Sequence, residues 1–427
     1  MIEFVAPNSE FPTLAVVVED RTSTLSGSLE EEFLVLLDSV GLKGCMAHKL
    51  NLRNIHPKHL IGKGQLEKVL EIIETNDIKQ LTINLDIDSR HQNSLTNMLG
   101  IPVYDRTAII LDVFARRART YEGKIQVEMA QIQYASSRLV RVWTHLERQR
   151  SGIGMRGGPG EKQLELDRRM LRERNARLKK RLEKVKKQRN LSRSSRRKAG
   201  FTTISLVGYT NAGKSTLFNL LTASAAQSSN ALFTTLDPTI RKVASKGGGD
   251  FLMADTVGFI ESLSKDLLQS FAATFGEIQD SNLLLHVIDI TDKGIERKQE
   301  AVEDLLEQLG ASEIPTIMIY NKVDKSEDTS LPDISYDADG NPAAIWISAA
   351  NQVNIDAVTK SIEFFVKQAG TYRSGYDATA SDIYPADEKL DENAHPAGDY
   401  EDNHEDYESD YEEDNDNNSK ESPTRTL

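Results

Sequence analysis

The sequence lacks the features of secreted, membrane-spanning and metal-cluster proteins. Cys45 is the single cysteine among 427 residues, which excludes an intrachain disulfide and a thiolate metal cluster. No apolar run reaches the roughly 18 residues that a membrane-spanning helix needs. The first residues, MIEFVAPNSEF, are acidic and have neither the basic start nor the apolar stretch of a signal peptide. We therefore expect a cytoplasmic protein without a membrane anchor, and separately we expect a monomer.

The charge is unevenly distributed along the chain. The formal net charge is −13, but residues 371–427 hold 18 Asp and Glu against 4 Lys and Arg, a net charge of −14. Residues 1–370 therefore carry a net charge of only +1. A segment this polar and like-charged cannot bury a core, so we predict that 371–427 is an acidic, disordered tail.

The first 120 residues alternate between strand and helix patterns. This alternation predicts a small α/β domain at 1–120, with a mostly parallel sheet covered by helices. The expected strands are 14–19, 45–52, 80–85 and 101–105, and the expected helices are 28–41, 64–76 and 89–99.

From about Tyr121 the apolar residues repeat every seven positions. The repeat appears twice, at Ile125, Ile132, Leu139 and Leu146 and then at Leu164, Leu171, Leu178 and Val185. Two such helices joined by the glycine-rich stretch 151–160 predict a long antiparallel helical hairpin over 121–200. Each helix is expected to have roughly 25–30 residues and a length of about 40 Å.

The second helix of this hairpin is strongly basic. Residues 161–200 contain 17 Lys and Arg against 5 Asp and Glu, a net charge of +12. The Ser, Arg and Gly content of 190–200 predicts a linker. The charge suits a phosphate-lined surface, where counterion release supplies much of the affinity. For a charge run taken alone, a solvated coiled coil is the other interpretation.

A phosphate-binding loop is predicted at Gly208–Ser215, which reads G-x-x-x-x-G-K-S. It follows the strand pattern ISLV and precedes the helix pattern STLFNLLTA. Gly208 and Gly213 allow backbone N–H groups to surround phosphate, Lys214 supplies positive charge, and the Ser215 hydroxyl is an Mg²⁺ ligand. The loop predicts a P-loop nucleotide site in residues 201–370.

The nucleotide is predicted by NKVD, Asn321–Asp324, which follows the apolar run TIMIY. The carboxylate of Asp324 can accept hydrogen bonds from N1–H and the exocyclic amine of guanine. Adenine has no such pair of donors, so the site is predicted to bind GTP and GDP rather than ATP.

Three further motifs occur in the order that a GTPase requires. In DTVGF, Asp255 is predicted to hold Mg²⁺ through water, and the N–H of Gly258 to meet the γ-phosphate. In FTTLDPT we favour Thr235 over Thr234 as the second Mg²⁺ ligand. The motif ISAA, Ile347–Ala350, is expected to contact guanine O6 through its backbone.

Lys214, Thr235 and Gly258 are the predicted catalytic residues. The predicted nucleotide-binding residues are Gly208, Tyr209, Thr210, Asn211, Ala212, Gly213, Lys214, Ser215, Thr216, Phe233, Thr234, Thr235, Leu236, Asp237, Asp255, Thr256, Val257, Gly258, Asn321, Lys322, Val323, Asp324, Ser348, Ala349 and Ala350.

Two positions raise questions about catalysis. The residue after DxxG is often a glutamine that orients the attacking water, but here it is Phe259, which cannot hydrogen-bond. We hypothesise that intrinsic hydrolysis is slow and that a partner or another residue completes the site. Asn211 in the P-loop either ligates K⁺, which would supply positive charge, or only braces the loop. The sequence leaves both alternatives open.

Read together, these segments resemble the HflX family of ribosome-associated GTPases. The resemblance covers roughly residues 12–367 and includes three segments outside the generic GTPase motifs. These are HLIGKGQLEKV (59–69), YDRTAIILDVFARRARTYEGKIQVEMAQIQY (104–134) and LVRVWTHLERQRSGIGMRGGPGEKQLELDRRML (139–171). The GTPase motifs FTTLDPT and DTVGFI, with an apolar residue at Phe259, are also similar to those of this family.

The resemblance implies a factor that binds the large ribosomal subunit and splits stalled or idle ribosomes under stress. It implies that the hairpin tip enters an RNA cavity, with contacts from Gly152, Arg156, Gly157, Gly158 and Gly160. From the residues themselves, Arg156 is able to stack on bases or bind phosphate. Two alternatives remain: an RNA-binding module in which hydrolysis is a timer, and a non-ribosomal signalling GTPase.

Overall fold

The computed structural model describes most of the chain up to residue 368. The described residues are 4–19, 26–51, 56, 59–139, 159–223, 233, 235–245, 249–260, 267, 270–292, 294–328 and 330–368. The predicted tail 371–427, the tip residues 151–158 and Thr234 lie outside them. In the described part, the chain has no helix that is long and apolar enough to span a membrane.

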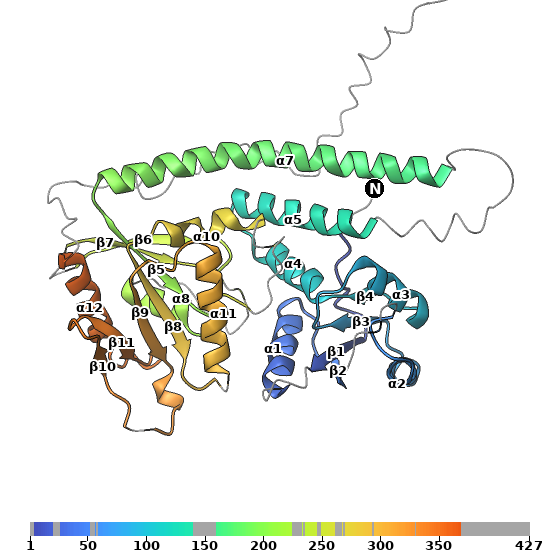
Figure 1. Ribbon diagram of the computed structural model, residues 1–427, viewed down its shortest axis with the longest axis horizontal. Coiled ribbons are helices and arrows are strands. Elements are labelled where there is room, and N and C mark those ends of the chain that lie inside the picture. Colours follow the sequence, from blue (N-terminus) through green and yellow to red (C-terminus); the bar gives the residue numbers. More distant parts are fainter. Residues whose placement is uncertain are drawn as a thin grey trace, which may run out of the picture. The chain divides into compact units, whose positions relative to one another are not determined.

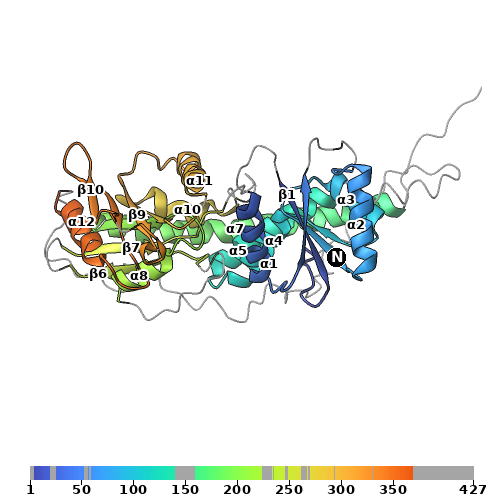
Figure 2. The same cartoon turned by 90° about the horizontal axis from the view of Figure 1, so that it is seen from below.

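The N-terminal region is a four-stranded sheet with helices on both faces (Figure 2). Neighbouring strands are all parallel, in the order β2-β1-β3-β4. Alternate residues of β1 face opposite cores, with Ala15 and Val17 on the side of α1 and α4, and Leu14 and Val16 on the side of α2 and α3. The elements are β1 (Thr13–Glu19), α1 (Ser26–Ser39), β2 (Met46–Asn51), α2 (Lys63–Thr75), β3 (Gln80–Ile83), α3 (Ser89–Leu99), β4 (Val103–Tyr104) and α4 (Arg106–Arg117).

The predicted parallel α/β fold of this region is confirmed, although α4 was not predicted. Asp105 begins this helix, because its carboxylate accepts a hydrogen bond from the N–H of Ala108. Residues from Arg106 to Phe114 are all buried. The apolar run AIILDVF within it does not by itself distinguish a buried helix from a buried strand, so the helix was not predicted.

Two long helices, α5 (Tyr121–Leu139) and α7 (Pro159–Lys198), lie side by side (Figure 1). Glu122 near the start of α5 pairs with Arg189 near the end of α7, whereas Glu128 pairs with Arg174 further back. Partners that run in opposite sequence directions show that the helices are antiparallel.

The apolar seam of this hairpin can be compared with the predicted repeat only where side chains are described, which leaves out Leu139, Leu146 and Leu164. The buried members among the described side chains are Ile125, Ile132, Leu171, Leu178 and Leu182. Leu182 was not predicted and Val185 is only half-buried, because an α-helix drifts from a strict seven-residue repeat as it continues.

The length of α7 corrects two boundaries. With 40 residues it is longer than the predicted 25–30. It begins at Pro159, inside the predicted tip, where proline fits a first helical turn because its missing N–H has no helical partner. It also continues through most of 190–200, which was predicted as a linker.

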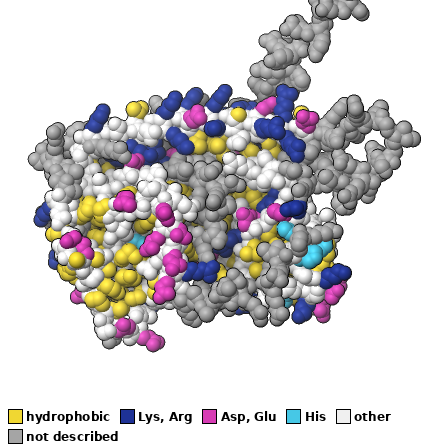
Figure 3. Space-filling view, in the orientation of Figure 1, with side chains coloured by type: hydrophobic (Ala, Val, Ile, Leu, Met, Phe, Trp, Pro, Cys, Tyr) yellow, Lys and Arg dark blue, Asp and Glu magenta, His cyan; other side chains and the backbone are white. Residues whose placement is uncertain are grey.

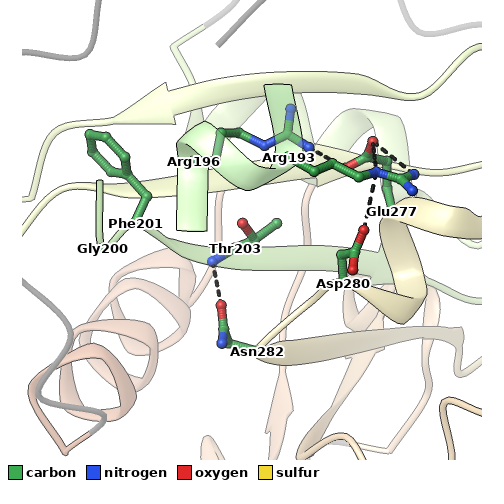
Figure 4. Close-up of a pocket in the computed structure, with 8 residues that line it drawn as sticks. All are labelled: Arg193, Arg196, Gly200, Phe201, Thr203, Glu277, Asp280 and Asn282. Carbon is green, nitrogen blue, oxygen red and sulfur yellow. Dashed lines mark hydrogen bonds and ion pairs between the residues drawn. The ribbon is translucent and has the colours of Figure 1, made fainter. Parts of the chain in front are cut away.

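The end of α7 packs against α10 (Ala272–Gln279) through ion pairs, and Figure 4 shows a pocket at this seam. Arg189, Arg193 and Arg196 all contact the buried carboxylate of Glu277. Burial alone would raise the pKa of Glu277, but the guanidinium groups, Arg196 foremost, hold it below its usual value. These charge-assisted pairs favour a helix at the end of α7, where the serines have a lower helix propensity than the arginines.

The C-terminal half is a seven-stranded sheet in the order β10-β11-β9-β8-β5-β7-β6. Pairs β10–β11 and β6–β7 are antiparallel, and the other neighbours are parallel. Helices α10 and α11 cover one face, and α8 and α12 cover the other. The further elements are β5 (Thr202–Val207), α8 (Lys214–Leu221), β6 (Thr239–Val243), β7 (Phe251–Asp255), β8 (Leu283–Asp289), α11 (Ile295–Gln308), β9 (Thr316–Asn321), η1 (Val323–Lys325), β10 (Ile334–Tyr336), β11 (Pro342–Trp346) and α12 (Ile355–Gln368).

One apolar cluster joins the N-terminal region to the nucleotide-binding half. It contains residues of α1 and α4 together with residues of α10 and α11. Phe114 of α4 packs edge-on against Phe233 and Phe271, with ring centroids 4.8 and 4.7 Å apart. The two halves therefore share part of their cores.

Candidate functional site

The candidate site lies where β5 ends and α8 begins. Gly208 has φ 141° and Gly213 has φ 103°, backbone conformations that side chains other than glycine rarely adopt. A Cβ on Gly208 would lie 2.2 Å from the carbonyl oxygen of Val287, and one on Gly213 would lie 2.2 Å from Asn321 Nδ2. The two glycines thus allow a tight loop that ends at a helix N-terminus, where backbone N–H groups favour an anion.

Lys214 is the cation of this loop. Its side chain is buried, and its Nζ donates hydrogen bonds to the carbonyl oxygens of Gly208 at 2.9 Å and Tyr209 at 2.7 Å. Burial lowers the pKa of Lys214 to about 8, and the nearby Asp255 opposes this change. The ammonium therefore remains mainly protonated at neutral pH, held at the loop that is shaped for phosphate.

Three oxygen-bearing side chains converge beside the lysine. Asp255 Oδ2 accepts hydrogen bonds from Ser215 Oγ at 2.8 Å and Thr235 Oγ1 at 2.7 Å, and the two hydroxyls are 3.0 Å apart. Burial raises the pKa of Asp255, while the two hydroxyl donors and Lys214 oppose the change. Hydroxyl and carboxylate oxygens are the ligands that Mg²⁺ prefers, so this donor set fits that ion.

The two predicted guanine motifs also meet. Asn321 donates from Nδ2 to the carbonyl oxygen of Ala212 at 2.8 Å and accepts from the N–H of Ala349 at 2.9 Å. It therefore braces both motifs against the P-loop. Ser348 donates to Asp324 Oδ1, which orients a carboxylate that is otherwise exposed.

Gly258 and Phe259 connect the DxxG motif to the P-loop through the backbone. The N–H of Phe259 donates to the carbonyl oxygen of Gly208 at 3.1 Å, and the N–H of Thr210 donates to that of Phe259 at 2.8 Å. A Cβ on Gly258 would lie 2.8 Å from Thr210 Cγ2, so glycine is needed there. The Phe259 side chain is 1% exposed and packs near Phe275, within the apolar core.

Several predicted nucleotide-binding residues have side chains that contact other parts of the chain. Phe233 is buried against Phe114, and Leu236 is buried in the same cluster. The carboxylate of Asp237 accepts hydrogen bonds from the N–H groups of Arg119 and Thr120. Asn211 is exposed and has φ 62°.

The structure adds contacts that the motifs did not predict. Glu32 of α1 accepts a hydrogen bond from the Tyr209 hydroxyl, and Lys298 of α11 lies 4.8 Å from the centre of the Tyr209 ring. Lys322 pairs with Asp289 at the end of β8, at 2.6 Å. No local pattern reveals such partners, because they are distant in sequence and are brought together by the sheet and the shared core.

The fold and this loop define a P-loop GTPase, and comparisons with known proteins agree. Residues 203–322 match the family described as "50S ribosome-binding GTPase". Residues 28–115 match "GTP-binding GTPase N-terminal", and residues 117–196 match "GTP-binding GTPase Middle Region". The three matched regions follow one another along the chain.

Curated relatives identify the family. The chain is 43% identical to the GTPase HflX of Escherichia coli over 332 residues, which cover 78% of each protein. It is 45% identical to the GTPase HflX of Magnetococcus marinus over 303 residues, covering 71% of this chain and 70% of that protein. This chain belongs to the GTPase HflX family, and it is a GTP-hydrolysing enzyme.

A solved structure is also similar. A GTP-binding protein of Sulfolobus solfataricus in complex with GDP is 22% identical, with a TM-score of 0.43. The match covers 84% of this chain and 99% of that one.

Proposed function

We propose that this chain is a cytoplasmic, monomeric factor that binds the large ribosomal subunit in its GTP-bound form and dissociates stalled or idle ribosomes. The observation that carries the proposal is the attachment of a long basic helix to a GTPase site. The ion pairs of α7 with Glu277 join that helix directly to the nucleotide-binding half. The description "50S ribosome-binding GTPase" of the family matched by 203–322 supports the choice of partner.

In this proposal each part of the site has one role. Lys214 and the P-loop amides bind the β- and γ-phosphates, the N–H of Gly258 meets the γ-phosphate, and Asp324 selects guanine. Ser215 and Thr235 would hold Mg²⁺ directly, and Asp255 would do so through water. When bound, the ion would neutralise charge on the phosphates during transfer to water.

The RNA-binding surface is proposed to be the exposed side of α7 together with the tip, whose predicted contacts lie outside the described residues except Gly160. Figure 3 shows Lys and Arg side chains along the edge of the molecule that α7 forms. Arg172, Arg177, Lys180, Lys184 and Lys187 are all exposed. Such a surface favours a polyanion, since each phosphate contact releases counterions.

A charge-reversal pair tests the surface. We expect K180E/K184E to bind 50S subunits at least about tenfold more weakly than wild type, with a shallower dependence on salt. K360E/K367E on α12 changes the net charge equally at exposed positions and should bind normally. Equal binding by both variants would contradict the proposed surface.

Splitting is tested separately by gradient sedimentation of 70S ribosomes with the protein and GTP. We expect subunits to accumulate with wild type and intact ribosomes to remain with K214A. Ribosomes that stay intact with wild-type protein, GTP and excess factor would contradict the dissociation activity.

A second candidate is a nucleotide-gated RNA-binding module that acts by occupancy, with hydrolysis as its timer. The burial of Phe259 favours it, because this side chain cannot orient water. Normal binding of K214A to 50S subunits would support the module, and loss of binding would support the GTP-dependent factor. Undetectable or salt-insensitive ribosome binding by wild type would instead point to a non-ribosomal signalling GTPase.

The role of Asn211 is a separate proposal. Its exposed position in the P-loop is compatible with a K⁺ ligand beside the phosphates. Turnover is expected to be faster in KCl than in NaCl at equal ionic strength, and N211A should remove the difference. Equal rates for wild type in both salts would leave Asn211 as a brace of the loop.

A further inference from the structure

Two residues of the FTTLDPT motif, two positions apart, contact opposite halves of the chain. Thr235 Oγ1 donates to Asp255 in the nucleotide site. The Asp237 carboxylate instead accepts hydrogen bonds from the N–H groups of Arg119 and Thr120, both at 2.8 Å. The Thr120 hydroxyl also donates to it. A short, bent segment therefore joins the nucleotide site to the residues that precede α5.

These contacts lie at the point where the hairpin begins. Thr120 precedes the first residue of α5, and its hydroxyl accepts a hydrogen bond from the N–H of Gly123 at 3.0 Å. Asp237 therefore binds the two N–H groups immediately before the helix and also orients the hydroxyl that caps its first turn. A carboxylate at this end of a helix is also favoured by the helix dipole.

Gly123 shows how closely the two segments approach. A Cβ at this position would lie 2.3 Å from Asp237 Oδ1, which is far inside van der Waals contact. Glycine is otherwise unfavourable inside a helix. Its presence in the first turn of α5 is explained by the carboxylate that packs over it.

On the other side of Thr235 in the sequence, Phe233 contacts the N-terminal region. Phe233 is 2% exposed and packs edge-on against Phe114 of α4. The segment that carries Thr235 is thus held at both ends by elements outside the nucleotide-binding half.

We propose that Asp237 is a positioning residue that couples occupancy of the nucleotide site to the order of the first turn of α5. GTP and its ion fix Thr235, which holds Asp237 on the helix start; with GDP this restraint on the helix start weakens. Because coupling between two sites is reciprocal, a partner that fixes the hairpin also strengthens GTP binding. The inference depends on the proposed placement of Thr235 at the metal ion.

Hydrogen exchange of the full-length protein tests the coupling directly. Backbone amides 119–124 are compared with bound GDP and with a non-hydrolysable GTP analogue, both with Mg²⁺. Wild-type amides should exchange at least about fivefold more slowly with the analogue, the lower end of ordinary allosteric coupling. In D237A the two nucleotides should give equal rates. A nucleotide dependence that persists in D237A would overturn the proposal.

A second variant leaves Asp237 in place. G123A displaces the carboxylate by steric overlap and should lose the nucleotide dependence as D237A does. The matched control is G64A in α2, where a Cβ would meet no atom within 4 Å and wild-type behaviour is expected. Retained dependence in G123A would contradict the coupling, because the contact cannot form unchanged beside a methyl group.

The metal assignment is checked by T235A. If Mg²⁺ strengthens analogue binding to T235A as much as to wild type, Thr235 is not a metal ligand and the placement fails at that step. If T235A loses this Mg²⁺ effect while D237A keeps nucleotide-dependent exchange, the coupling fails although the placement holds.

Discussion

At the scale of single residues, Asp324 is the residue that we propose selects guanine. Its carboxylate is exposed at η1 and oriented by Ser348, so a guanine ring beside it would present two N–H donors. We expect wild type to bind GTP at least about tenfold more tightly than inosine triphosphate, which lacks the 2-amino group. D324A should bind both weakly and with similar affinity, as measured by calorimetry.

The control for this prediction is D328A. Asp328 is an exposed carboxylate four residues further along, and it accepts hydrogen bonds from Ser330. D328A should discriminate between the two nucleotides as wild type does. Undiminished discrimination in D324A would show that another group reads the base.

The burial of the Asp105 carboxyl group predicts that the stability of the folded protein depends on pH. Its side chain is fully buried, and burial raises its pKa to about 6 against the opposing effects of Arg138, the N–H of Ala108 and the Tyr134 hydroxyl. Asp86 adds to the increase. The folded state therefore binds the carboxyl proton of Asp105 more tightly than the unfolded state does. This protonation stabilises the folded state below about pH 4, and the stabilisation is lost as the pH rises to about 6.

The measurement is urea unfolding of wild type and D105N across this range. The stability of wild type relative to D105N should fall by roughly 2–3 kcal/mol between about pH 4 and about pH 6.5. D88N is a control of opposite sign, since hydrogen bonds from His91 and nearby charges outweigh burial and lower the pKa of Asp88. Parallel curves for wild type and D105N would contradict the expected titration.

At the scale of elements, the sequence predicted those helices, strands and loops whose residue pattern lies within a single short segment. The strands β1 to β4 and the helices α1 to α3 follow ordinary alternation and amphipathic spacing, and the P-loop follows from glycine and lysine positions. The helix α4 and the last turns of α7 were not predicted. The apolar run of α4 does not distinguish a helix from a strand, and the last turns of α7 form ion pairs with the distant Glu277 and Asp280.

The Glu277 cluster provides a test at this scale. E277A leaves three guanidinium groups of α7 without their shared carboxylate, and we expect the free energy of unfolding to fall by about 3–5 kcal/mol. D280A removes one ion pair with Arg193 at a more exposed position and should cost less than about 1 kcal/mol. Equal losses in the two variants, measured by chemical unfolding, would contradict a specific role for Glu277.

At the scale of the whole molecule, the motifs predicted the residues of the nucleotide site. They did not predict the contacts that this site makes with the N-terminal region and with the start of the hairpin. Glu32 of the N-terminal region accepts a hydrogen bond from Tyr209 of the P-loop. Asp237 of the nucleotide-binding half accepts one from the N–H of Thr120, just before α5. Both contacts join segments more than one hundred residues apart in sequence. They arise from the packing of two sheets against shared helices, which a pattern within one segment does not contain.

GTP turnover in KCl, with and without 50S subunits, tests the central claim most directly. We expect slow turnover by the protein alone, because the Phe259 side chain lies in the core and orients no water, and strong stimulation by the subunit. K180E/K184E should lose most of that stimulation while keeping its turnover alone. Fast turnover alone, unchanged by 50S subunits, would contradict the claim that the site is completed on the ribosome.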